Sequence, residues 1–285
     1  MTYCLDNLFE KFVRERIYLK NVSEDTAYFY WQAWRAFKRV HTKETVCQDD
    51  LIDFLIQHKQ KGIKAVSINT YSRALNAFFN WAFTGGHLPE KLRIEKLKEE
   101  KPALKTVTEN HLRAVVKFKP RTFSEERLWV LLQLLIDTGV RIREATTLEK
   151  DRVDFDNLLL TVKGKGGKER IIPFSLELRK VLYRYMSKFP GRLVFATKQG
   201  GQLDYNTVKD DYYDLCVKLG LKDRGFHRLR HTFAISHVRN GGTLFGLQKI
   251  LGHADLSVTR RYVELQTDDL IREHQKTSQL GRLKS

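Results

Sequence analysis

Apolar residues recur every three or four positions through the first hundred residues, a spacing that predicts amphipathic helices. The stripe in LDNLFEKFVRER consists of Leu5, Leu8, Phe9 and Phe12. Further helices are predicted in VSEDTAYFYWQAWRAFKRV, for which Ser23 is a suitable N-cap, in QDDLIDFLIQHKQKG and in SINTYSRALNAFFNWAF. Four such helices with short connections indicate a small helical bundle.

The pattern changes over residues 91–107, KLRIEKLKEEKPALKTV, which are highly charged and carry no cluster of large apolar side chains. This composition predicts a linker between two domains, and a solvated helix is the alternative. Both interpretations allow a boundary here, and we expect domains at residues 1–104 and 105–285.

The second domain mixes two periodicities. HLRAVVKF and ERLWVLLQLLIDTG predict helices, and the second is so apolar that it should be buried. LLLTV and RIIPF are β-type runs on either side of the glycine-rich GKGGK, which is typical of a hairpin. The remainder returns to helical spacing, so the predicted fold class is mainly α with a small β-sheet.

Charge narrows the choice of partner. The 285 residues include 51 Lys and Arg against 34 Asp and Glu, a formal net charge of +17, and 42% of them are hydrophobic, enough for globular cores. Such a balance favours a polyanion, either nucleic acid or an anionic membrane surface, although charge can also serve solubility alone.

The cysteines Cys4, Cys47 and Cys216 are scattered and form no CxxC pair, which argues against a disulfide framework or a zinc site and suits a reducing cytoplasm. The N-terminal region has no apolar stretch long enough for a signal peptide, and no window approaches a membrane span. Nucleic acid therefore becomes the favoured partner over a membrane.

Two short motifs carry cations next to glycines. In DTGVRIREATTLE, Arg141 follows a predicted helix end, where its guanidinium could bind a phosphate; a surface ion pair with Glu144 is the alternative. In VKGKGGKERIIP, Lys165 and Lys168 lie at the hairpin tip, where they could enter a groove or simply be solvated. The run GKGGKE does not match a P-loop.

A third motif, FHRLRHTFAISH, places His227, Arg230 and His231 on one helical face, so that a histidine and an arginine could hold two oxygens of a phosphodiester. The histidine spacing also suits a metal, but neither the glutamate of HExxH nor a third ligand is evident, so we expect no metal. His231 could equally be a buried, hydrogen-bonded histidine that supports the helix.

The fourth motif, LGHADLSVTRRYVEL, contains His253 and, nine residues later, Tyr262, which is either a packing residue or a nucleophile. A phenol with a pKa of about 10 is a poor nucleophile at neutral pH. It reacts if cations stabilise the phenolate and the charge on phosphorus, and if an acid protonates the leaving oxygen. Arginines, a lysine and histidines in one domain supply that combination.

The runs TGVRIRE, VKGKGGKERIIP, HRLRHTFA and LGH, followed by a tyrosine, resemble the tyrosine recombinase (phage integrase) superfamily over nearly the whole chain. VSEDTAYFYWQAW and SINTYSRALNAFFNWA resemble that family's helical core-binding, SAM-like DNA-binding domain. Small departures are Arg143, where a short side chain is usual, and Phe245 with Gly246, where many relatives are more polar.

The resemblance implies a role for each motif residue. Arg141 and Arg230 would clamp the scissile phosphate, and Glu144 would orient Arg141. Lys165 would protonate the leaving 5′ oxygen, with Lys168 as the weaker alternative. His227 and His253 would hydrogen-bond the phosphate and help proton transfer, with His231 in support. Tyr262 would attack phosphorus and form a 3′-phosphotyrosine link.

The resemblance also implies a C-shaped clamp on double-stranded DNA, with a dimer on each inverted-repeat core site. Four identical protomers would exchange strands of two duplexes through a Holliday junction without a cofactor, in the cytoplasm and in association with the nucleoid. A helix-like run in the tail, residues 268–274, would dock into a neighbouring protomer. Candidate DNA contacts, each of which could also be merely solvated, are Arg35, Lys38, Arg73, Lys168, Lys209 and Arg228.

The chain begins close to the core-binding domain and has no room for an arm-binding domain. We therefore expect a simple, Xer-like recombinase, either a resolving enzyme or one that integrates and excises a mobile element. The alternatives are a type IB topoisomerase, a non-catalytic DNA-binding regulator on the same scaffold, and an RNA- or membrane-binding basic protein.

Overall fold

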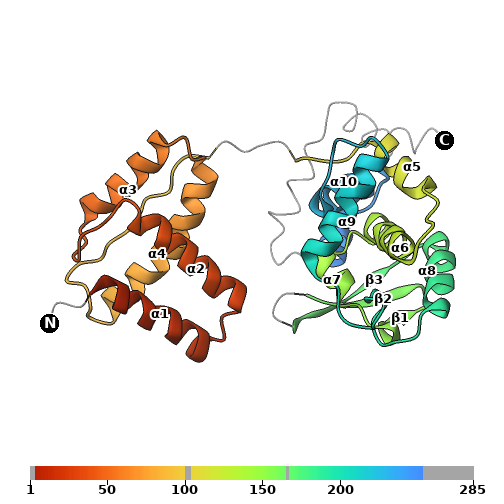
Figure 1. Ribbon diagram of the computed structural model, residues 1–285, viewed down its shortest axis with the longest axis horizontal. Coiled ribbons are helices and arrows are strands. Elements are labelled where there is room, and N and C mark those ends of the chain that lie inside the picture. The colour runs from red at the N-terminus through yellow and green to blue at the C-terminus, as the bar shows by residue number, and fades with distance from the viewer. Residues whose placement is uncertain (1–3, 100–103, 165–166, 253–285) are drawn as a thin grey trace, which may run out of the picture. The chain divides into compact units, whose positions relative to one another are not determined.

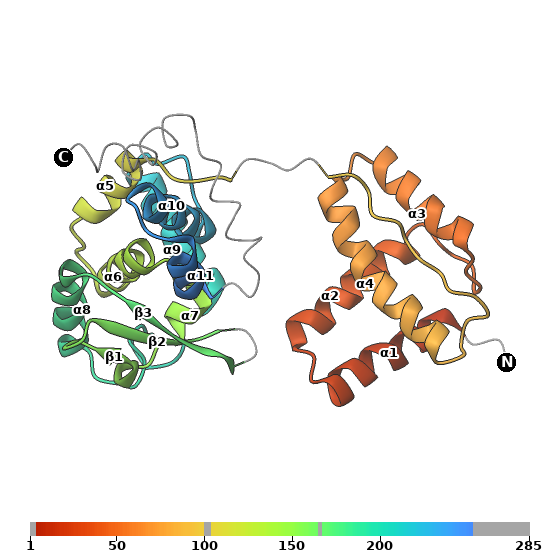
Figure 2. The same ribbon diagram turned by 180° about the vertical axis from the view of Figure 1, so that it is seen from behind.

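The computed structural model describes residues 4–99, 104–164 and 167–252, and Figure 1 and Figure 2 show it from opposite sides. The chain divides into two compact units, residues 1–102 and 103–285. Helices predominate and one small antiparallel sheet is present, which confirms the predicted fold class. Among the described residues, no helix combines the length and the apolar character needed to cross a bilayer.

The first unit is built around aromatic side chains. Its helices within residues 4–99 are α1 (Leu5–Lys20), α2 (Glu24–Lys38), α3 (Gln48–Gln60) and α4 (Ala65–Thr84). Phe9 stacks on Trp34 with ring centroids 4.4 Å apart and meets Phe78 edge-on. The hydroxyl of Ser23 accepts a hydrogen bond from the backbone N–H of Thr26, so the predicted N-cap of the second helix is confirmed.

The predicted linker is wrong for residues 91–99, which pack against the first unit. Leu92 and Ile94 are buried in its core. The Asn76 side-chain amide donates to the carbonyl of Ile94 over 2.9 Å and accepts from its N–H over 2.8 Å. Asn69 accepts a hydrogen bond of 2.8 Å from the N–H of Leu97. Two apolar side chains and a few amide contacts thus hold an otherwise charged, extended segment.

Near the start of the second unit, Val107 is buried in its core. The elements within residues 104–164 and 167–252 are α5 (Glu109–Lys117), α6 (Phe123–Thr138), α7 (Ile142–Thr146), the 3-10 helix η1 (Lys150–Arg152), β1 (Val153–Asp154), β2 (Leu159–Lys163), β3 (Glu169–Pro173), α8 (Leu176–Lys188), α9 (Tyr205–Lys218), α10 (Phe226–Arg239) and α11 (Leu244–Leu251).

The apolar helix α6 lies in the middle of this unit, as predicted from its sequence. It packs against α5, α8, α9 and α10, and both views show the sheet on one side of it and α10 on the other (Figures 1 and 2). It ends where Gly139 takes a left-handed backbone conformation, with φ of 63°, that glycine adopts without steric cost. This turn leads directly into α7.

The sheet has the order β1-β2-β3, and both pairings are antiparallel. The predicted hairpin corresponds to β2 and β3, in which Leu160 pairs with Ile172 and Val162 pairs with Arg170. Leu160, Val162 and Ile172 are buried, so this face of the hairpin faces the core. The two-residue strand β1 was too short for the sequence pattern to predict.

Candidate active site

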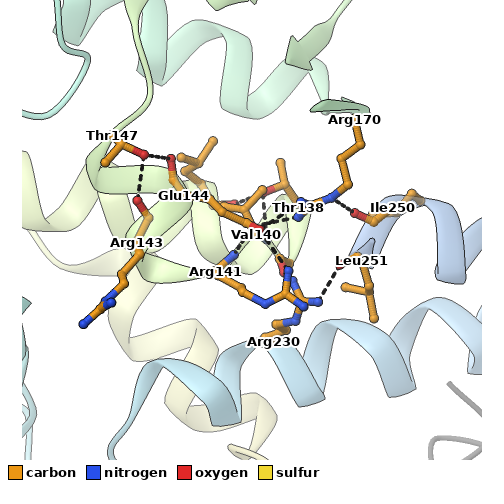
Figure 3. A network of polar contacts seen from close by, with 12 residues as sticks. Thr138, Val140, Arg141, Arg143, Glu144, Thr147, Arg170, Arg230, Ile250 and Leu251 are labelled. Carbon is orange, nitrogen blue, oxygen red and sulfur yellow. Dashed lines mark hydrogen bonds and ion pairs between the residues drawn. The ribbon is translucent and has the colours of Figure 1, made fainter. Parts of the chain in front are cut away.

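Arg141 lies at the turn between α6 and α7, as the N-cap residue of α7. Its backbone N–H donates to Oε2 of Glu144 over 2.8 Å, and its Nη1 donates to Oε1 of the same carboxylate over 2.9 Å (Figure 3). The Arg141 side chain is 39% exposed and that of Glu144 only 5%. A buried carboxylate therefore fixes the arginine while part of the guanidinium stays accessible, so an ion pair and phosphate binding are compatible here.

Arg230 lies on α10 and is buried. Its Nη1 donates to the carbonyl oxygen of Gly139 over 2.8 Å, and its Nη2 donates to that of Leu251 over 2.7 Å (Figure 3). These bonds join the ends of α6 and α11 to α10. Because a guanidinium stays charged even when buried, the bonds also place a permanent positive charge at this junction.

His227 lies one turn before Arg230 on α10 and is accessible to solvent. The pKa of His227 lies below the ordinary histidine value because partial desolvation disfavours the charged ring and because Arg230 and Arg141 add positive charge nearby. A neutral imidazole offers one donor and one acceptor, which suits a group that bonds a phosphate oxygen. His231 follows on the same helix and is half-buried rather than fully buried.

Arg170 is a site residue that sequence reasoning missed. Its Nη1 and Nη2 donate to Oε1 and Oε2 of Glu144 over 2.8 and 2.7 Å, a bidentate pair in which the Arg170 side chain is 12% exposed. Its Nε donates to the carbonyl oxygen of Ile250 over 2.8 Å (Figure 3). Glu144 thus accepts hydrogen bonds from both Arg141 and Arg170.

The pKa of Glu144 shows which effect dominates at this carboxylate. Burial is the largest influence and would raise the pKa, but the hydrogen bonds from Arg170 and from the Arg141 backbone and side chain outweigh it and hold the pKa below the ordinary value. Glu144 is therefore ionised at neutral pH and balances part of the positive charge of the two arginines.

Three predicted catalytic residues, Lys165, His253 and Tyr262, lie outside the described residues. The structure describes the chain on both sides of Lys165. The N–H of Gly164 donates to the carbonyl of Lys168 over 2.8 Å, which closes the end of the hairpin. It also describes Gly252, the residue that precedes His253 in the chain.

Four of the candidate DNA-contacting side chains are exposed and two make ion pairs. The exposed ones are Arg35 on α2, Arg73 on α4, Lys168 and Lys209 on α9. Lys38 is 3.2 Å from Asp6, and Arg228 pairs with Asp223. The ion pairs give Lys38 and Arg228 a second role within their own unit. The exposed cations can bind a polyanion directly, whereas Lys38 and Arg228 would first give up their contacts to Asp6 and Asp223.

The described residues bring Arg141, Arg230 and His227 together, with Glu144 and Arg170 behind them. Two guanidinium groups and a neutral imidazole can bind a phosphodiester and stabilise negative charge that develops on it. Within residues 4–99, 104–164 and 167–252, no cluster of three His, Cys, Asp or Glu side chains is suited to a metal. Arg143 is exposed and points away from the other labelled arginines (Figure 3).

Comparison of the sequence with known proteins confirms the resemblance drawn from the motifs. Residues 105–268 match the phage integrase family. The tyrosine recombinase XerA of Pyrococcus furiosus is 33% identical over 223 residues, which cover 76% of this chain and 76% of that protein. The tyrosine recombinase XerC of Syntrophus aciditrophicus is 27% identical over 301 residues, with 94% of this chain and 96% of that protein covered.

Solved structures share the fold. The Tn1549 transposon integrase in complex with transposon right end DNA superposes with a TM-score of 0.78 at 20% identity, over 100% of both chains. The XerH site-specific recombinase bound to palindromic difH substrate, in a post-cleavage complex, gives 0.75 at 19% identity, over 94% of this chain and 83% of that one. The architecture is thus that of chains whose structures were solved with DNA.

Proposed function

The chain belongs to the phage integrase family and is a tyrosine recombinase, and from that premise we propose that it cuts and rejoins DNA at specific sites through a 3′-phosphotyrosine intermediate. The observation that carries the proposal is the junction of α6, α10 and α11, where Arg141, Arg230 and His227 gather. The guanidinium groups of Arg141 and Arg230 are fixed there by hydrogen bonds to the protein itself, so their positive charges are in place before substrate binds.

In the proposed reaction Arg141 and Arg230 bind the non-bridging oxygens of the scissile phosphate and stabilise the charge that grows on them. The phenol oxygen of Tyr262 attacks phosphorus, and the bond from phosphorus to the 5′ oxygen breaks. Lys165 gives its proton to that oxygen, and the phenol proton passes to an imidazole, for which His227 and His253 are the candidates. Attack by another 5′ hydroxyl reverses these steps and rejoins a strand.

The phosphotyrosine bond conserves the energy of the phosphodiester, so the proposed cycle uses no metal, nucleotide or other cofactor. Glu144 keeps Arg141 in place through the two hydrogen bonds described above. Its depressed pKa supports this role, because an ionised carboxylate accepts from two arginines without needing a proton.

The two units, with a core-binding domain at residues 1–104 and a catalytic domain at 105–285, would close around one duplex as a C-shaped clamp. The chain has 51 basic and 34 acidic residues. This positive balance supports binding to DNA, because contacts to phosphates supply affinity that is independent of base sequence. A dimer would occupy each inverted-repeat site, and a homotetramer would exchange strands of two duplexes through a Holliday junction, with tail residues 268–274 docked on a neighbour.

The curated relatives named XerA and XerC support a Xer-like resolving role, and integration or excision of a mobile element is the second candidate. The likeness to a transposon integrase carries the fold alone at 20% identity. In either role the enzyme would act on nucleoid DNA in the cytoplasm.

The test begins with a DNA site that the protein selects from a random-sequence library. Supercoiled plasmids carrying two copies of this site, in direct or inverted orientation, are incubated with the wild type and with Tyr262→Phe. Recombinant circles and a Holliday junction that depend on both sites support a recombinase. Relaxation of plasmids that lack the site would instead indicate a topoisomerase, and selective binding without strand cutting would indicate a regulator.

A further inference from the structure

Arg170 is a charged residue on the buried face of a strand. It pairs across the hairpin with Val162 and lies two residues before Ile172, both of which are buried. Side chains two apart on a strand point to the same face, so Arg170 is directed toward the core rather than the solvent. A cation there needs partners, because burying an unpaired charge is costly.

Its partners come from two separate elements. The bidentate pair with Glu144 reaches α7, and the hydrogen bond to the carbonyl of Ile250 reaches the last turn of α11 (Figure 3). Arg170 also limits the space around Gly252, where an added Cβ would lie 2.9 Å from Cδ of Arg170 and 3.0 Å from its Nε. One side chain therefore connects the start of β3 to the two helices that flank the site.

This connection is made at the base of the turn that carries Lys165. Directly after β2, an added Cβ at Gly164 would lie 3.5 Å from Nη1 of Arg170 and 3.8 Å from Oε1 of Glu144. Both strands thus pass the Arg170–Glu144 pair just before the turn. Lys163, at the end of β2, is exposed to solvent.

The other side-chain contact described at this end of the hairpin is weaker. Glu169 forms an ion pair of 3.4 Å with Arg152, and both side chains are more than one third exposed. Exposed pairs of this kind contribute little to stability or to position. The buried, bidentate contact of Arg170 is the stronger restraint on the turn.

We propose that Arg170 is a positioning residue that holds the base of the hairpin against α7 and α11, so that Lys165 reaches the 5′ oxygen it protonates. This inference rests on the proposed function, since it takes Lys165 as the proton donor. Arg170 itself touches neither DNA nor the reacting atoms in this account. Its loss therefore affects mainly protonation of the leaving group. Arg141 keeps its own two hydrogen bonds to Glu144, so attack on phosphorus changes far less.

A substrate with sulfur in place of the bridging 5′ oxygen separates these effects. A thiol has a pKa near 8.5, far below that of an alcohol, so a thiolate leaves without a proton donor. On this substrate the phenol oxygen of Tyr262 bonds to phosphorus, the phosphorus–sulfur bond breaks, and the thiolate carries away the electron pair. A variant that has lost only the placement of its acid should still cleave it.

The experiment measures single-turnover formation of the covalent complex on matched oxygen and sulfur substrates. The variants are Arg170→Met and Arg170→Lys, with Glu169→Gln as the neighbouring control and Lys165→Ala as the reference for a missing acid. We expect Arg170→Met to form the covalent complex roughly a hundredfold more slowly than the wild type on the oxygen substrate, because its proton donor is misplaced. On the sulfur substrate its rate should be close to that of the wild type. Arg170→Lys should show the same pattern less strongly, and Glu169→Gln should match the wild type.

If both Arg170 variants cleaved both substrates more slowly by the same factor, the proposal would be overturned. Arg170 would then serve phosphate binding by the arginines or the stability of the fold. Unchanged cleavage of the oxygen substrate would overturn it as well. Failure of the proposed function looks different: the wild type itself would give no covalent complex on either substrate, or Tyr262→Phe would still give one. If Lys165→Ala cleaved both substrates at the wild-type rate, Lys165 would not be the proton donor, and the role proposed for Arg170 would be refuted with it.

Discussion

Arg230 donates a hydrogen bond of 2.8 Å to the backbone carbonyl of Gly139, the glycine that ends the buried helix α6. The contact joins two of the four sequence motifs, TGVR and HRLRH, which lie 91 residues apart in the chain. The close approach depends on the glycine, because a Cβ added there would lie 2.3 Å from Cδ1 of Phe233 on α10. Helix packing and the position of Arg230 are thus set by the same residue.

We predict that Gly139→Ala destabilises the protein more than Gly220→Ala does. Both glycines have a left-handed backbone, with φ of 63° and 66°, so each alanine costs about 1–2 kcal/mol of conformational strain. Only Gly139 is crowded, since an added Cβ at Gly220 meets nothing within 4 Å. Urea unfolding of the two variants measures the difference, and equal losses would show that Phe233 moves aside at no cost.

Arg230→Met should lower both stability and DNA cleavage, whereas Arg141→Met should affect chiefly cleavage. Arg230 is buried and donates to two carbonyls that would lose their partner, a loss of about 1.5–3 kcal/mol for a bond to a charged group. The Arg141 side chain is 39% exposed, so solvent can replace part of its contacts. Chemical denaturation and single-turnover cleavage test both variants, and a greater loss of stability for Arg141→Met would contradict the expectation.

Stability should depend on the ionisation of Glu144. A folded-state pKa below the unfolded value, which is about 4.3, means that the carboxylate contributes stability above that pH and loses it as the pH falls through the folded pKa. Glu144→Gln removes this contribution. The difference in unfolding free energy between wild type and variant should therefore be largest near neutral pH and shrink below about pH 4. A difference independent of pH would show that hydrogen bonding, not charge, holds the pair.

His227 should also lower stability on acidification, but in a higher pH range than Glu144 does. Its folded-state pKa lies below the unfolded value of about 6.5, so the unfolded chain binds the proton first and stability falls as the pH drops below that value. His227→Gln lacks this titration. The wild type should lose stability relative to the variant as the pH falls through about 6.5, as measured by urea unfolding. A gain for the wild type on acidification would mean that His227 is stabilised as the cation.

The basic surface should reveal itself through the salt dependence of DNA binding. Replacing a cation that contacts phosphate lowers the slope of log affinity against log salt by about 0.9. We expect this for Arg73→Gln and Lys209→Gln, whose side chains are exposed on α4 and α9. Arg192→Gln is the control, since Arg192 pairs with Glu149 over 2.8 Å. Equal slopes for all three variants and the wild type would remove Arg73 and Lys209 from the interface.

Periodicity was sufficient to predict most helices because their buried faces repeat within a few turns. The stripe ending at Phe12 and the cap at Ser23 are local signals, and both appear in the structure as expected. The hairpin was equally local, with glycines between two β-type runs. The helix α7, only five residues long, has too few turns to show a stripe.

The errors arose where long-range contacts decide the structure. Residues 91–99 resemble a solvated linker because only Leu92 and Ile94 are buried, and the amides that bind the segment come from α3 and α4, which precede it in the chain. Arg170 was overlooked as one more cation in a basic run. The available signal was its register, because it faces the same side as Ile172 and so must find a buried partner. Its partners Glu144 and Ile250 lie 26 and 80 residues away.

The most direct test of the account is to identify the residue that becomes joined to DNA. The wild type is trapped on a nicked duplex carrying its selected site, the complex is digested with protease and nuclease, and the modified peptide is sequenced by mass spectrometry. The account predicts a nucleotide attached through its 3′ phosphate to Tyr262, and no covalent complex with Tyr262→Phe under conditions where both proteins shift the DNA. A nucleotide on any other residue, or equal covalent complex from both proteins, would contradict it.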